Sequence, residues 1–228
     1  MSVAAPLPPS ANAPATPKSS SRDRLRNGMR MERREFHRRY ELQPQGFRAE
    51  LIKGVVYITD PMSKNRPHGR WTYLIQQWLG MYERRTPTVI GRADTTTALG
   101  EFSEPEPDAQ LRHRSEDEAD EADVVTGPPG LVVEVADSTR RLDLGVKRHD
   151  YETEGVPEYL VVDLQRRQVR WFIRDDDQLF VDLAPDADGL YKSRVFPGLW
   201  LNAAALFAED LTALEAAVEV GVAERDAA

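Results

Sequence analysis

The segment GPPGLVVEVADSTRRLDLGVKRHDYETEGVPEYLVVD, residues 127–163, decides the fold. It holds two apolar, β-branched runs, LVVEVA and VPEYLVVD, whose composition is typical of strands that are covered on both faces. The residues between them, STRRLDLGVKRHDYETEG, predict a helix that closes at Gly155. A helix that crosses between two buried strands indicates an α/β fold with a mixed sheet and flanking helices.

The flanking sequence extends this pattern in both directions. RAELIKGVVYITD, residues 48–60, predicts two short strands joined by a turn at Lys53 and Gly54. HGRWTYLIQQWLGMYERR, residues 68–85, has apolar residues at the spacing of an amphipathic helix. QVRWFIRD and QLFVDLAP predict a hairpin, and the last apolar segment of the chain predicts a C-terminal helix.

The chain of 228 residues divides into three parts by composition. Residues 1–28 are rich in Pro, Ala and Ser without hydrophobic periodicity, and they predict a disordered basic tail. Residues 29–210 predict one domain, and residues 211–228 predict a helical tail. Residues 1–39 carry nine Lys and Arg against three acids, whereas the whole chain has a net charge of -8. Such an arm either contacts nucleic acid or is a solvated tail, and composition alone favours the tail.

The composition also excludes several classes of protein. There is no cysteine, so disulfides, thiolate metal sites and cysteine nucleophiles are excluded, and a reducing cytoplasm is compatible with this usage. No apolar run reaches the ~20 residues that cross a bilayer, and the N-terminus lacks the pattern of a signal peptide. We therefore expect a cytoplasmic protein without a membrane partner. The sequence has no phosphate-binding glycine loop and no serine elbow. It therefore gives no support to a nucleotide switch or a serine hydrolase.

Three carboxylates lie in strand-like surroundings: Glu50 in AELI, Asp108 after Pro107, and Glu134 in the middle of LVVEVA. A charge on a buried strand is costly unless it is paired or bound to a metal. Hard divalent cations such as Mg²⁺ prefer carboxylate oxygens together with water and substrate phosphate. The three acids therefore suggest metal-assisted hydrolysis of a phosphodiester, although an acidic chain also places some acids in strands by chance.

Lys147 follows in the predicted helix, four residues after Asp143 and four before Tyr151, so the three share one helix face. A lysine beside the acids would position the attacking water or stabilise the growing negative charge. The ordinary alternative is an exposed Asp–Lys pair worth a few tenths of a kcal/mol, and spacing alone favours it. His68 in RPHG also has two interpretations, a phosphate contact or a helix cap.

The order of the motifs AELIKGVVY, PHG, EPDAQL, LVVEVADST, DLGVKRHDYETEGVPEYLVVD and VFPGLWL resembles the Uma-two family of restriction-endonuclease-like domains. That family belongs to the PD-(D/E)XK nuclease superfamily, and the resemblance covers roughly residues 29–210. It implies a restriction-endonuclease-like mixed sheet flanked by helices. Asp108 matches the acid of the PD element, Glu134 the second acid, and Glu50 the early acid of the family.

The resemblance implies an Mg²⁺-dependent endonuclease, with Mn²⁺ as an alternative cofactor, that hydrolyses phosphodiester bonds in DNA. Glu50, Asp108 and Glu134 would be catalytic residues and metal ligands. The main-chain carbonyl of Val135 would add a further metal ligand.

One departure from the family pattern and one feature of the chain leave an alternative open. A further departure is Asp137, which we interpret as a helix cap. The superfamily lysine normally stands two residues after the second acid, where this chain has Ala136, and the resemblance implies that Lys147 takes its role. SEDEADEAD, residues 115–123, is an acidic loop that would repel phosphate. Both features suit a nuclease-fold binding or scaffold protein that cleaves weakly or not at all. The resemblance also implies a homodimer, to which the aromatic helix around Trp71 and Trp78 would contribute.

Overall fold

The computed structural model describes residues 21–59, 66–117 and 124–228. Its centre is one sheet whose strands are β3 (Val89–Arg92), β5 (Ala109–His113), β7 (Leu131–Ala136), β8 (Glu158–Asp163), β9 (Gln168–Arg174) and β10 (Phe180–Asp182). The order across the sheet is β10-β9-β8-β7-β5-β3, with β7 and β8 parallel and the other neighbours antiparallel. The predicted α/β fold with a mixed sheet is confirmed.

The segment of residues 127–163 forms the predicted crossover between β7 and β8. Its helix begins at Arg140, passes through a π-helical segment, Leu142–Lys147, and continues as α3 (Arg148–Thr153). The π-helical segment is a departure from the predicted regular helix, and it lies directly before α3.

Strand β7 is buried on both faces, as its composition predicts. Because side chains alternate along a strand, β7 contributes to two separate cores. Leu131, Val133 and Val135 enter the main core, whereas Val132 and Ala136 enter a second core together with Tyr151 of α3.

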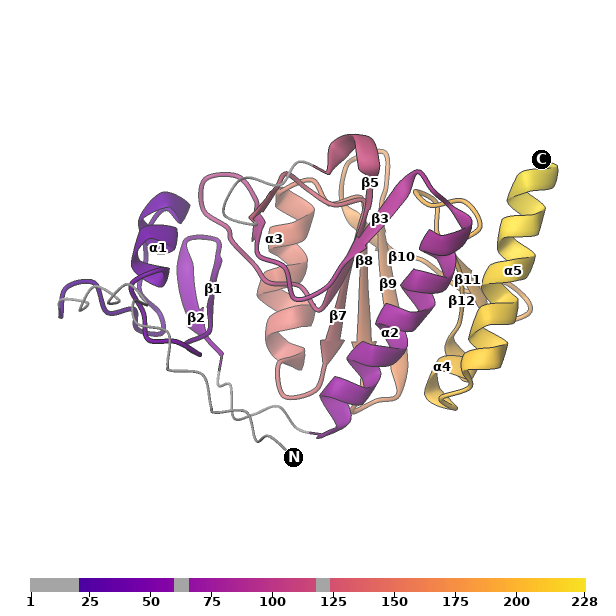
Figure 1. Cartoon of the computed structure of the whole chain (residues 1–228), viewed down its shortest axis with the longest axis horizontal. Coiled ribbons are helices and arrows are strands. Elements are labelled where there is room, and N and C mark those ends of the chain that lie inside the picture. The colour runs from indigo at the N-terminus through magenta and orange to yellow at the C-terminus, as the bar shows by residue number, and fades with distance from the viewer. Residues whose placement is uncertain (1–20, 60–65, 118–123) are drawn as a thin grey trace, which may run out of the picture.

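Helices α2 (Arg66–Arg85), α4 (Ala203–Phe207) and α5 (Leu211–Ala227) cover the main core, on the side of the sheet opposite α3 (Figure 1). The two-stranded pair of β11 (Leu190–Lys192) and β12 (Trp200–Asn202) lies beside α5. Trp71 and Trp78 are buried in this core. Their suggested role as dimer contacts is therefore wrong, because their rings are enclosed by the chain itself.

The C-terminal residues belong to the same core. Leu214, Val218 and Val222 of α5 are buried in it, so the predicted helical tail is packed against the domain along its length. None of the helices in the described parts of the chain is long and apolar enough to span a membrane.

The N-terminal lobe, residues 21–58, lies on the far side of α3 from the sheet (Figure 1). It comprises α1 (Arg33–Tyr40) and the predicted hairpin of β1 (Ala49–Ile52) and β2 (Val55–Ile58). Lys53 and Gly54 form the turn with φ of 50° and 72°, the left-handed conformation that two-residue hairpin turns need.

The first residues of the lobe are ordered against this hairpin, although the sequence predicts a disordered tail up to residue 28. Leu25 is buried in the core of the lobe, and the N–H of Gly28 donates to the carbonyl of Val56 at 2.8 Å. Leu25 and hydrogen bonds to distant residues anchor the segment, and hydropathy patterns are insensitive to such contacts. Residues 1–20 lie outside the described part of the chain.

A connecting segment, residues 100–106, joins the lobe to the rest of the molecule. Leu51 and Glu104 exchange backbone hydrogen bonds of 3.2 and 2.7 Å, as neighbours in a sheet do. Nearby, the short strands β4 (Thr97–Ala98) and β6 (Val125–Thr126) pair in parallel, and Arg114–Glu116 forms a short 3₁₀ helix. Most of the acidic loop predicted at residues 115–123 lies outside the described residues.

Candidate active site

The sheet brings Asp108 beside Glu134. Alternation along β7 turns Glu134 toward the α3 face, where it is only 4% exposed. Strands β5 and β7 pair with Ala109 opposite Val133, so Asp108, just before β5, lies next to Glu134. The N–H of Val135 donates to Oδ2 of Asp108 at 2.7 Å and fixes that carboxylate.

The N-terminal lobe supplies Glu50 to the same place. Glu50 lies in β1, and its Oε1 accepts a hydrogen bond from the N–H of Glu106 at 2.8 Å. The same oxygen lies 2.8 Å from Nζ of Lys147. The hairpin is therefore joined to the helix after β7 by a buried ion pair.

Lys147 joins the two buried acids. Its Nζ lies 2.9 Å from Oε1 of Glu134, and the Tyr151 hydroxyl donates to the same oxygen at 3.0 Å. Spacing alone predicts an exposed Asp143–Lys147 pair. That prediction is wrong, because both side chains are buried. Asp143 instead accepts a hydrogen bond from the Thr139 hydroxyl at 2.5 Å.

The π-helical segment explains why spacing alone misplaces these residues. A π-helical turn contains one more residue than an α-helical turn, so the side chains that follow it are rotated about the helix axis. Both Asp143 and Lys147 lie within this segment and both face the interior. Turns of this kind are frequent at functional sites.

Burial controls the protonation of the cluster. It raises the pKa of Glu134 well above its ordinary value, although the nearby Lys147 ammonium lowers it. Burial alone would lower the pKa of Lys147, but the Glu134 and Glu50 carboxylates outweigh it and raise that pKa. Burial also raises the pKa of Asp143 to about 6. The lysine is therefore the charged partner that these acids share.

His68 and Asp108 form the more exposed edge of the cluster. Nε2 of His68 lies 3.4 Å from Oδ2 of Asp108, and its Nδ1 lies 3.4 Å from the Thr72 hydroxyl. The hydrogen bond to Asp108 raises the pKa of His68, against the effect of burial. The partly exposed His68 imidazole therefore lies beside the Asp108 carboxylate.

The chemical type of these side chains suits a divalent cation. Glu50, Asp108 and Glu134 offer hard carboxylate oxygens, and the two that are most buried already share a cationic partner, the Lys147 ammonium. Within residues 21–59, 66–117 and 124–228, however, no group of three His, Cys, Asp or Glu side chains is arranged to hold a metal ion. The metal ligands, including the Val135 carbonyl, stay a prediction.

Sequence reasoning missed two partners of the site. The four-residue spacing predicts an exposed position for Asp143, and it assigns Tyr151 only to the same helix face. The Tyr151 ring does pack on Tyr159, with 4.9 Å between ring centroids, but its hydroxyl also binds Glu134. The four-residue spacing from Lys147 to Tyr151 is the sequence signal that could have indicated this second donor.

Comparisons with known proteins agree with this architecture. The model of the Uma2 family, described as a putative restriction endonuclease, matches residues 33–204. A crystal structure from Anabaena variabilis ATCC 29413, described as a putative nuclease belonging to DUF820, superposes with a TM-score of 0.58 and 12% sequence identity. The similarity covers 82% of this chain and 99% of that one, and at this identity it shows the fold alone. No curated protein matches the chain.

Proposed function

The chain belongs to the Uma2 family of putative restriction endonucleases, and from this premise we propose that it is a metal-dependent endonuclease that hydrolyses phosphodiester bonds in DNA. One observation carries the proposal. Lys147, displaced from the signature position at Ala136, still reaches both Glu50 and Glu134 in the interior. A buried lysine between two acids is costly to keep for stability alone, and its ammonium would stabilise the negative charge that develops on a phosphate during hydrolysis.

In this proposal Glu50, Asp108, Glu134 and the main-chain carbonyl of Val135 would hold Mg²⁺, with Mn²⁺ as a substitute. When bound, the cation would polarise a phosphoryl oxygen and lower the pKa of a water molecule bound to it. The Val135 N–H keeps the Asp108 carboxylate in place, and the Tyr151 hydroxyl does the same for Glu134.

Two further side chains would act on the substrate. The Lys147 ammonium would orient the attacking water and stabilise the negative charge that develops on the phosphate. His68, on the exposed side of Asp108, would donate a hydrogen bond to a substrate phosphate oxygen.

Plasmid nicking tests the proposal. The wild-type protein should nick supercoiled plasmid DNA with Mg²⁺ or Mn²⁺, and chelation of the metal should stop it. Glu134→Gln and Asp108→Asn should each lower nicking by at least about a hundredfold. Asp188→Asn, in an exposed turn, is the matched control and should nick normally. A wild-type protein that neither binds metal nor cleaves DNA or RNA would overturn the proposal.

A nuclease-fold binding or scaffold protein is the second candidate, and one observation favours it. Lys147 already neutralises the acids that would hold the metal, and Glu50 and Glu134 are 5% and 4% exposed. Calorimetric titration with Mn²⁺ separates the two candidates. Nucleic-acid binding without Mn²⁺ binding or cleavage would support the second.

We also propose a homodimer, on the family resemblance alone. Since Trp71 and Trp78 are internal, another surface would form the contact. Light scattering on the purified protein would give the mass, and a monomer at all concentrations would rule the dimer out.

A further inference from the structure

The basic segment of residues 21–40 is part of a folded surface. It contains eight arginines and three acids. Leu25 and Phe36 from this segment are buried with Leu51 and Val56 of the hairpin, so its arginines are held at fixed positions on the N-terminal lobe. The solvated tail that composition favours is therefore limited to residues before this segment.

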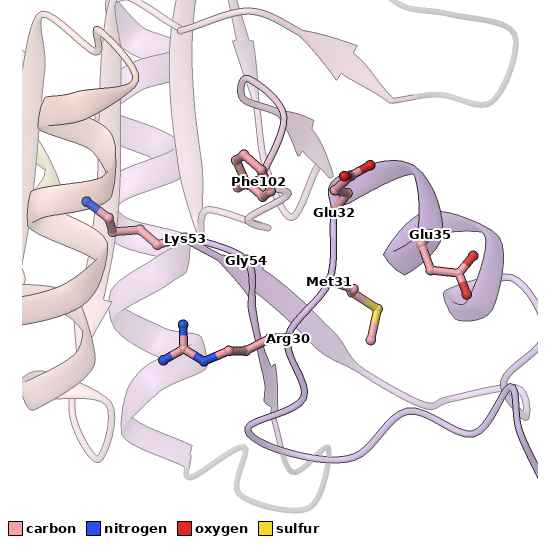
Figure 2. Close-up of a pocket in the computed structure, with 7 residues that line it drawn as sticks. All are labelled: Arg30, Met31, Glu32, Glu35, Lys53, Gly54 and Phe102. Carbon is pink, nitrogen blue, oxygen red and sulfur yellow. The ribbon is translucent and has the colours of Figure 1, made fainter.

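A pocket of about 550 Å³ opens at the tip of the hairpin (Figure 2). Gly54 of the left-handed turn packs closely against two other lining residues. A Cβ at this position would lie 3.3 Å from the Met31 carbonyl and 3.4 Å from the Phe102 ring. The volume of the pocket falls within the range of small-molecule sites, about 300–1,000 Å³. The lining residues are Arg30, Met31, Glu32, Glu35, Lys53, Gly54 and Phe102.

The pocket is lined by two cations, Arg30 and Lys53, and two acids, Glu32 and Glu35. Arg30 and Lys53 are exposed, and neither forms a salt bridge with any residue that the structure describes. Glu35 is already paired, with Arg38 at 2.9 Å and Arg39 at 2.6 Å, and its hydrogen bonds to these arginines lower its pKa to about 2. The two cations are therefore available to an anion. Glu35 is compensated by its arginines, whereas Glu32 is exposed and forms no salt bridge within the described residues.

The pocket also has an aromatic wall. Phe102 is 45% exposed, so one face of its ring is open to a ligand. Figure 2 shows Arg30 and Lys53 directed to one side of the pocket, and Glu32 and Glu35 to the other side, toward α1. An exposed ring beside two unpaired cations matches the chemistry of a nucleotide, which has a flat base and a phosphate.

We propose that this pocket binds one unpaired nucleotide of a single-stranded nucleic acid, with its base on Phe102 and a phosphate between Arg30 and Lys53. The base must be unpaired, because bases within a duplex are stacked on each other and cannot reach a protein ring. The assignment rests on the proposed nuclease function and names the substrate form that the enzyme would hold. Lys53 follows Glu50 by three residues of the same hairpin, about 10 Å along the strand. The hairpin thus links the nucleotide pocket to the candidate active site.

Fluorescence anisotropy with labelled oligothymidylate and with a duplex of equal length, both in metal-free buffer, tests the assignment. The wild-type protein should bind the single strand more tightly than the duplex. Arg30→Gln with Lys53→Gln should weaken single-strand binding about tenfold or more, and should reduce the salt slope by about 0.7 for the loss of one neutralised phosphate. Phe102→Ala should weaken it by about tenfold with an unchanged salt slope.

The matched control is Arg84→Gln with Arg194→Gln. It removes the same charge from two exposed arginines, one near the end of α2 and one between β11 and β12. Screening limits its effect to about threefold. Thermal unfolding of all variants would verify that they fold.

The outcomes separate this assignment from the nuclease function. If the pocket variants bind like the control, or if the duplex is preferred and Phe102→Ala has no effect, the nucleotide pocket is wrong. Plasmid nicking that depends on Glu134 would still support the nuclease in that case. If the wild-type protein neither binds nor nicks nucleic acid, both proposals are wrong.

Discussion

The N-terminal lobe and helix α5 are both added to the central sheet, but different forces hold them. Helix α5 fills the main core with apolar side chains and contacts α2 and β12. The lobe has a small core of its own, and it meets the rest of the chain through backbone hydrogen bonds and several ion pairs. The most buried of these pairs is Glu50–Lys147. Apolar contacts need only complementary shapes, whereas a buried ion pair needs both charges. The lobe is therefore held in part by the same groups that form the candidate active site.

Lys147→Met should have the largest effect, because it removes the most buried charged contact of the lobe. The Glu50 and Glu134 carboxylates would stay buried without a cation. Removal of one partner from a buried ion pair costs about 3–5 kcal/mol. Urea unfolding followed by tryptophan fluorescence would measure this loss in the free energy of unfolding.

Lys192→Met is the control for this comparison. It removes a partly exposed lysine whose Nζ lies 3.1 Å from Oδ2 of Asp186. An exposed ion pair of this kind contributes at most about 1 kcal/mol. Equal losses in the two variants would mean that the Glu50–Lys147 pair does not hold the lobe.

Gly221→Ala tests the apolar contact of α5 in the same way. A Cβ at this position would lie 2.5 Å from the Gly198 carbonyl oxygen and 2.8 Å from the Trp200 ring. The helix would have to move away from β12, at a cost of about 2–3 kcal/mol in the free energy of unfolding. Gly80→Ala places the same methyl group in open space on α2, and it should be neutral or stabilise by up to about 1 kcal/mol. Similar stability of the two variants would contradict tight packing of α5.

Asp150→Asn tests a second buried charge at the lobe contact. Asp150 accepts a hydrogen bond from the Ser103 hydroxyl at 2.8 Å, and burial raises its pKa from 3.8 to about 6. The folded state holds this proton more tightly than the unfolded chain, so stability present below about pH 4 is lost as the pH rises through about 6. Asparagine resembles the protonated acid, so the variant should be more stable than the wild type by on the order of 2 kcal/mol at about pH 8.

Urea unfolding at two pH values measures this difference. At about pH 4 the variant and the wild type should be equally stable, because Asp150 is then protonated in the folded protein. Asp188→Asn, on an exposed turn, should not change the pH dependence. A gain from Asp150→Asn that is the same at both pH values would contradict a raised pKa.

Lys53→Met should have the smallest effect on stability. Lys53 is exposed at the hairpin tip, only three residues from Glu50, but it forms no salt bridge within the described residues. The free energy of unfolding should change by less than about 0.5 kcal/mol in urea unfolding. A larger loss would mean that Lys53 supports the fold of the lobe, and its availability to a ligand would then be in question.

Local pattern is sufficient to predict much of the fold. The β-branched runs around Val133 and Val161 and the apolar stripe of α2 each identify their element, because burial requires that composition. The position of β5 between β3 and β7 is not predictable in this way, since strand order depends on contacts between residues far apart in the chain. Residues 21–28 are anchored by Leu25 and by hydrogen bonds to Gln43 and Val56, and these partners are distant in the sequence.

For the candidate site, the sequence identifies the acids better than the lysine. Glu134 is conspicuous because it interrupts an apolar strand. Asp143 and Lys147 have the spacing of an exposed helical pair, and only the family resemblance suggests another role for Lys147. Both lie on the interior face of the π-helical segment, and no residue propensity marks such a segment in the sequence.

The π-helical segment has a consequence for how such a site can evolve. Lys147 and Tyr151 both donate to one oxygen of Glu134, while Asp143, earlier in the same helix, binds Thr139. Each residue of a regular helix turns the next by about 100°, so removal of one residue from this segment would separate these contacts. A single inserted residue can thus direct a lysine into a site from a neighbouring helix after the strand has lost its own. Insertion within a helix, as well as substitution in a strand, is a route by which catalytic side chains change their position in the chain.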